Sequence, residues 1–95
     1  MTEICTKILG NTSDQAFTEQ LHRLGHNGHV EYLVVSEADL PRKRLRGTTD
    51  RGTECVIALP RNSSLTHGAI LVLSAARAII VELEALPWMR LIPVD

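Results

Sequence analysis

The fold is decided by residues 42–59, which read RKRLRGTTDRGTECVIAL. Strict alternation along the first part places Arg42, Arg44 and Arg46 on one face of a β-strand. Residues 50–52 (DRG) have the composition of a tight hairpin turn, because glycine adopts a positive φ without steric cost. The residues after the turn alternate again, so the stretch predicts a β-hairpin with one basic face.

Short strand-like segments flank this hairpin on both sides, each bounded by turn-forming residues. They lie at residues 3–9, 30–36, 69–74, 77–84 and 88–92. Close spacing of many short strands is typical of small sandwiches and barrels.

One short helix is predicted at residues 12–24. A capping-box spacing at residues 12–15 opens it, and Gly25 is expected to end it. Its apolar side chains form a single stripe, made of Phe17, Leu21 and Leu24.

The composition is that of one small globular domain spanning residues 1–95. Hydrophobic residues make up 44% of the 95 residues and aromatic ones only 3%, so the core must be aliphatic. We expect a mainly β fold: two small packed antiparallel sheets, or an open barrel, of six or seven short strands, with the helix at 12–24 on one side. The predicted core is Ile4 or Ile8, Phe17, Leu21, Val34, Leu45, Ile57, Leu59, Leu71, Leu73, Ile79, Val81 and Leu91.

Charge and targeting signals limit the class of protein. The formal net charge of −1 argues against attraction of the whole surface to nucleic acid or to an anionic membrane. No apolar run approaches the ~18 residues of a membrane span, and no signal peptide is predicted. Two cysteines, Cys5 and Cys55, are too few for a disulfide framework. We expect a cytoplasmic protein with reduced thiols.

Three histidines form one candidate metal site, because imidazole suits nickel, zinc and copper. His22 and His26 have the i, i+4 spacing that joins two imidazoles on a helix, and His29 follows in the connector. The predicted helix end at Gly25 would separate the first two. The alternative is three solvated surface histidines.

The basic residues of the hairpin form a second candidate site, a protein-docking face. It consists of Arg42, Lys43, Arg44, Arg46 and Arg51. Arginines on one strand face repel one another, so this face is exposed to solvent or binds an anionic partner. It could bind an acidic protein segment, or serve only to protect a sheet edge from aggregation. Nucleic acid is less favoured, because Tyr32 is the one aromatic side chain near in sequence.

Catalytic patterns are weak. Cys55 and His67 could form a nucleophilic pair, but Cys55 alternates with apolar residues and fits a buried position better. Trp88, next to Met89, fits either a partner anchor or a lid on the core. With no paired carboxylates, triad or phosphate loop, we expect a protein that is not an enzyme.

The order of several short motifs resembles a known family. The basic hairpin at residues 42–54 is followed by IALPR at 57–61, LTHGAIL at 65–71 and IIVE at 79–82. With ILGN at residues 8–11, this pattern resembles the N-terminal domain of UreE, a family of urease accessory proteins.

That resemblance implies a nickel chaperone that helps to load urease. It implies two packed β-sheets that bind peptides or partner proteins, here urease apoprotein or other urease accessory proteins. The family's metal-binding histidine belongs to a second domain, which is expected to be missing here, so none of its ligands maps onto this chain. Nickel enters only through the resemblance. We expect a non-enzymatic protein-docking domain in urease maturation, with direct metal binding by His22, His26 and His29, or nucleic-acid binding by a small barrel, as the alternatives.

Overall fold

A computed structural model describes residues 2–84 of the chain. This part contains seven strands, one α-helix and one short 3₁₀ segment. In chain order they are β1 (Thr2–Cys5), β2 (Gly10–Asn11), α1 (Gln15–His26), β3 (Val30–Val35), η1 (Glu37–Asp39), β4 (Arg44–Thr48), β5 (Glu54–Ala58), β6 (Ala69–Leu73) and β7 (Ala78–Leu83). The strand expected at residues 88–92, with Leu91, lies outside the described residues.

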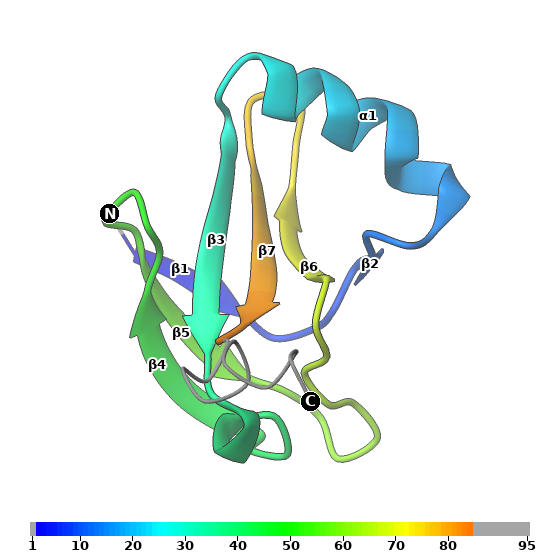
Figure 1. Cartoon of the computed structure of the whole chain (residues 1–95). Helices are drawn as coiled ribbons and strands as arrows, with labels where there is room; N and C mark the ends of the chain where they lie inside the picture. The colour runs from blue at the N-terminus through cyan, green and yellow to red at the C-terminus, as the bar shows by residue number, and fades with distance from the viewer. Residues whose placement is uncertain (1, 85–95) are drawn as a thin grey trace, which may run out of the picture.

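The strands form two sheets, and the mainly β prediction is confirmed. A three-stranded sheet has the order β1-β5-β4, and a four-stranded sheet has the order β2-β6-β7-β3 (Figure 1). They do not close into a barrel. Both sheets are mixed rather than antiparallel, because β1 pairs with β5 and β3 pairs with β7 in parallel. The parallel pairs join segments far apart in sequence, which local patterns do not reveal.

The decisive hairpin forms as predicted. Strands β4 and β5 pair antiparallel, from Arg44 opposite Ala58 to Thr48 opposite Glu54. Gly52 takes a φ of +90° in the turn between them. The alternating side chains then give this ribbon one face toward the core and one toward solvent.

The core fills the space between the two sheets and is largely aliphatic. Buried as predicted are Ile57, Leu59, Leu71, Ile79 and Val81. Leu45 and Ile8 pack against this core while partly exposed. Phe17, Leu21 and Leu73 are half-buried.

The core prediction for Val34 is wrong, because the phase of strand β3 differs from the expected one. In β3 the inward residues are Leu33 and Val35, while Val34 is 50% exposed. This phase also turns Glu31 inward, where it is buried. Of the alternatives Ile4 and Ile8, it is Ile8 that packs against the core; on β1 the buried residue is Cys5, and Ile4 is 72% exposed.

The elements of the N-terminal segment are each shorter than predicted. The strand expected at residues 3–9 is split between β1 and the two-residue β2. The helix begins at Gln15 after Asp14 as N-cap residue, instead of at residue 12. Residue 11 shapes this entry, because the Asn11 Oδ1 atom accepts a hydrogen bond from the Ser13 amide at 2.9 Å.

The helix also ends later than predicted, at His26 instead of before Gly25. Gly28, with a φ of +76°, is the glycine that terminates it. The amide of His29 donates to the carbonyl of Leu24 at 2.8 Å, and the amide of Gly28 donates to that of Gly25 at 3.1 Å. These two bonds are those of a Schellman motif. Gly25 therefore lies within the last helical turn.

Candidate functional site

The basic face lies along β4, an edge strand of the three-stranded sheet. Arg44 and Arg46 are exposed and alternate with Leu45, which points toward the core. Arg42 is also exposed, although it precedes the first residue of β4. Because the pleat sends alternate side chains to opposite faces, the predicted placement is confirmed for Arg44 and Arg46, whereas Arg42 lies outside the strand.

Acidic neighbours partly compensate this charge. The Arg46 Nε atom lies 3.5 Å from Glu54 Oε2, and the Arg42 guanidinium lies 3.5 Å from Asp39 Oδ1. Within residues 2–84, Arg44 takes part in no ion pair. Exposed pairs contribute little stability and exchange readily, so both paired arginines remain available to another carboxylate.

Lys43 and Arg51 occupy different surroundings from the arginines of the strand. Lys43 is half-buried, and its ammonium group donates to the carbonyl of Ser63 and to the Ser64 hydroxyl. It therefore attaches the loop after β5 to the start of β4. Arg51 is exposed in the hairpin turn, at the far end of β4.

Apolar side chains continue the basic face across the sheet. Arg46 is opposite Val56 on β5, and Val56 is opposite Ile4 on β1. Residues paired in this way project from the same face. A row therefore runs from an exposed arginine, over a half-buried valine, to an isoleucine that is 72% exposed. Local sequence patterns do not reveal this row, because the β1–β5 pairing joins distant segments.

The backbone of β4 adds hydrogen-bonding groups to the same edge. The Lys43 carbonyl accepts from the Leu59 amide at 2.8 Å, and the Thr49 amide donates to Thr53 at 2.8 Å. Odd-numbered residues of β4 thus bond to β5, and the amides and carbonyls of Arg44 and Arg46 point to the open edge. Such an edge can pair with an extended peptide.

The three histidines are only partly brought together. His22 and His26 project from the exposed side of α1, with their ring centroids 6.5 Å apart. His29 lies beyond the helix end, in the connector to β3. Within the described part of the chain, no group of three or more His, Cys, Asp or Glu side chains is placed to hold a metal ion.

A polar cluster that sequence reasoning missed joins the two sheets. The Arg77 guanidinium contacts Glu3 of β1 at 2.9 Å and Glu31 of β3 at 3.2 Å. The Thr49 hydroxyl donates to the other oxygen of Glu31 at 2.7 Å. Burial opposes ionisation of Glu31, but hydrogen bonds from Thr49 and Thr53 and the charge of Arg77 outweigh it and lower its pKa. The cluster therefore holds the ionised Glu31 carboxylate in a structural role.

The cysteines are buried and do not pair with His67. Burial raises the pKa of both thiols, that of Cys55 to about 11. His67 is exposed, and its Nδ1 atom accepts from the Leu83 amide at 3.1 Å. Thiols this far from ionisation are poor nucleophiles.

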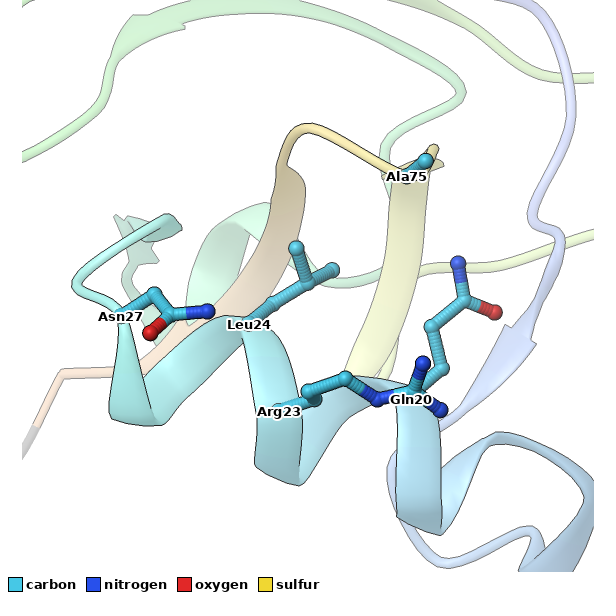
Figure 2. Close-up of a pocket in the computed structure, with 5 residues that line it drawn as sticks. All are labelled: Gln20, Arg23, Leu24, Asn27 and Ala75. Atoms are coloured by element: carbon cyan, nitrogen blue, oxygen red, sulfur yellow. The ribbon is translucent and has the colours of Figure 1, made fainter.

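A hollow of about 330 Å³ lies between α1 and the turn that joins β6 to β7 (Figure 2). Leu24 supplies its apolar wall, and Gln20, Arg23 and Asn27 supply polar groups. The Gln20 amide donates to the Ser74 carbonyl at 3.2 Å, which fastens the helix to this turn. The lining holds one guanidinium and two amides. These groups can bind a ligand by hydrogen bonds, but they do not form the acid–base pair that catalysis would need.

Other sequence predictions concern regions that add little to the site. Trp88 and Met89 lie outside the described residues. Tyr32, the aromatic residue nearest the basic stretch in sequence, belongs to β3 in the other sheet, and its backbone carbonyl accepts a hydrogen bond from the Asp50 amide in the hairpin turn. Within residues 2–84, no helix has the length and apolar character needed to cross a membrane.

Several known proteins are similar to this chain in sequence. Residues 5–84 match the family described as UreE urease accessory protein, N-terminal domain. Two relatives, each named urease accessory protein UreE 1, come from Pseudomonas syringae pv. tomato (strain ATCC BAA-871 / DC3000) and pv. syringae (strain B728a). Each is 44% identical over 92 residues, which are 97% of this chain and 63% of the relative. The chain thus spans less than two thirds of the length of these relatives.

The family match includes the basic hairpin, the histidine-bearing helix and both sheets, apart from most of β1. It favours an accessory protein over a nucleic-acid-binding barrel or a dedicated metal-binding protein. The resemblance seen in the ordered motifs is thereby confirmed, and the chain belongs to the UreE family of urease accessory proteins, matching that family's N-terminal domain.

Proposed function

We propose that this chain is a protein-docking domain in urease maturation and performs no bond chemistry itself. Its partners are urease apoprotein or other urease accessory proteins. Membership of the UreE family and the printed names of its relatives support this role. The proposal does not require the chain to coordinate nickel. The buried free cysteines, Cys5 and Cys55, suit a reducing compartment, so we propose that it acts in the cytoplasm.

The observation that carries the proposal is the outer face of the sheet β1-β5-β4. Arg44 and Arg46 stand exposed on an edge strand, beside apolar side chains that are also open to solvent. Folding alone does not explain this combination, because Ile4 gains little burial where it lies. Covering that row would remove apolar surface from water, while the arginines would orient the partner by its charge.

The chemistry of this face identifies the kind of partner it accepts. Guanidinium groups bind carboxylates with two parallel hydrogen bonds, so an acidic segment fits Arg44 and Arg46. An extended segment could also pair with the open backbone edge of β4 and place apolar side chains over Val56 and Ile4. We therefore propose an extended partner segment that carries both acidic and apolar residues.

The test is binding of the full chain to urease apoprotein and to its accessory proteins, measured by biolayer interferometry. The variant is Arg44→Glu with Arg46→Glu. The matched control is Arg23→Glu with Arg61→Glu, which changes the net charge equally at exposed positions of α1 and of the loop after β5. We expect the first variant to weaken binding by roughly a hundredfold, or about 3 kcal/mol, and the control by much less.

Salt dependence provides a second readout. Because exposed charges are screened, affinity of the unaltered chain should fall as ionic strength rises, and the affinity of the Arg44→Glu/Arg46→Glu variant should not. Equal binding by the unaltered chain and this variant would refute the docking face. So would an equal loss in the control.

A further inference from the structure

A pair of histidines on the exposed side of α1 has the spacing of a chelating site. His22 and His26 are four residues apart, and the helix continues unbroken through Gly25 between them. Side chains at i and i+4 project from the same helix face. The two ring planes lie 20° from parallel, with centroids 6.5 Å apart. The fold thus brings together two imidazoles that a helix end at Gly25 would have separated.

We infer that His22 and His26 form a binding site for one divalent transition-metal ion, such as Ni²⁺, Cu²⁺ or Zn²⁺. Imidazole nitrogen is a preferred ligand of these ions, and two histidines at i and i+4 can hold one ion against a helix. Metal–nitrogen bonds of about 2.0–2.1 Å require the rings to approach by roughly 1 Å. Both side chains are exposed and free to make that rotation.

The neighbouring charges permit a cation. A hollow of about 260 Å³ beside the pair is lined by both histidines together with Glu19, Arg23 and Asn27. The positive charge of Arg23 would oppose an ion, but its guanidinium lies 3.6 Å from the Glu19 carboxylate, which compensates it.

The site offers two protein ligands, and water completes the coordination of the ion. His29, expected from the sequence as a third ligand, belongs to the connector after the helix. Two imidazoles give weaker binding than a closed site of three or four protein ligands. The site is therefore suited to reversible binding of an ion rather than to a permanent structural metal.

The test is isothermal titration calorimetry of the tag-free full chain with NiCl₂ at neutral pH, in a buffer that does not bind metals. We expect one ion per chain. His22→Ala and His26→Ala should each weaken binding by roughly tenfold or more, and His29→Ala, the matched control, should change it by less than about twofold. All three histidines are exposed, so the variants should melt like the unaltered chain.

A second measurement locates the ion. In NMR spectra of the imidazole groups, substoichiometric Cu²⁺ should broaden the His22 and His26 resonances and leave those of His29 and His67 sharp. Cu²⁺ should also bind more tightly than Ni²⁺, because sites with nitrogen ligands generally have a higher affinity for Cu²⁺ than for Ni²⁺. Affinity unchanged in His22→Ala and His26→Ala, or equally lost in His29→Ala, would overturn the site. The inference goes beyond the docking function, and Arg44→Glu with Arg46→Glu should leave metal binding intact, so the two can fail separately.

Discussion

Replacing Glu31 by glutamine tests whether the buried ion pair stabilises the junction between the sheets. The Glu31 carboxylate lies 3.2 Å from Arg77 Nε and is almost wholly buried. At an effective dielectric constant of about 20, two unit charges at this separation attract by roughly 5 kcal/mol. Desolvation of the carboxylate offsets more than half of that attraction. We therefore expect Glu31→Gln to lower the free energy of unfolding by about 2 kcal/mol, and Tm by roughly 8–16 °C.

The dependence of this effect on pH separates charge from packing. Because the pKa of Glu31 is lowered in the folded state, its carboxylate contributes stability above the unfolded pKa of about 4.3 and loses that contribution as pH falls through the folded pKa. The difference in unfolding free energy between the unaltered chain and Glu31→Gln should be complete at neutral pH and shrink progressively below about pH 4.

Urea unfolding followed by circular dichroism, repeated across this pH range, measures that difference. Glu19→Gln is the control, because the Glu19–Arg23 pair lies on the exposed side of α1 and should contribute at most about 0.5 kcal/mol. A Glu31→Gln variant as stable as the unaltered chain at neutral pH would refute the argument. A loss of equal size at every pH would show that packing, and not charge, explains the effect.

Two glycine substitutions should act in opposite directions. Gly47→Val should destabilise the protein by about 2 kcal/mol in urea unfolding, because a Cβ atom at Gly47 would lie only 2.9 Å from Leu33 Cδ1 of the facing sheet. Gly25→Ala should stabilise it by about 0.5–1 kcal/mol in thermal melting, since Gly25 is helical and its new methyl group would meet one ordinary contact at 3.8 Å. A destabilising Gly25→Ala, or a neutral Gly47→Val, would contradict these contacts.

Local patterns predicted the parts of the fold that local physics determines. The β4–β5 hairpin follows from alternation and from a turn whose glycine needs a positive φ, and both can be seen within residues 42–59. The exposed position of Arg44 and Arg46 follows from the same alternation. Five of the six core residues predicted between residues 56 and 84 are buried, because the strands of this part of the chain are largely apolar.

The failures come from pairings and partners that are distant in sequence. Val34 is expected in the core, and that phase would turn Glu31 toward solvent, as is usual for a charged residue. In the structure Arg77, 46 positions later by residue number, neutralises Glu31, so the strand takes the opposite phase and buries Leu33. One buried ion pair thus reversed the assignment of a whole strand. The row from Arg46 to Ile4 was missed for a related reason, because β1 pairs with a strand about fifty residues away.

Lys43 shows where the candidate site itself could have been predicted better. It was grouped with the docking arginines because its charge is next to theirs in sequence. Alternation, applied strictly, puts residue 43 on the same side of the strand as Leu45, and the structure shows Lys43 half-buried against Ser63 and Ser64. Consecutive charged residues of a strand project from opposite faces of the sheet. A docking face must therefore be defined by the parity of its residues, and by that criterion Arg44 and Arg46 form its centre.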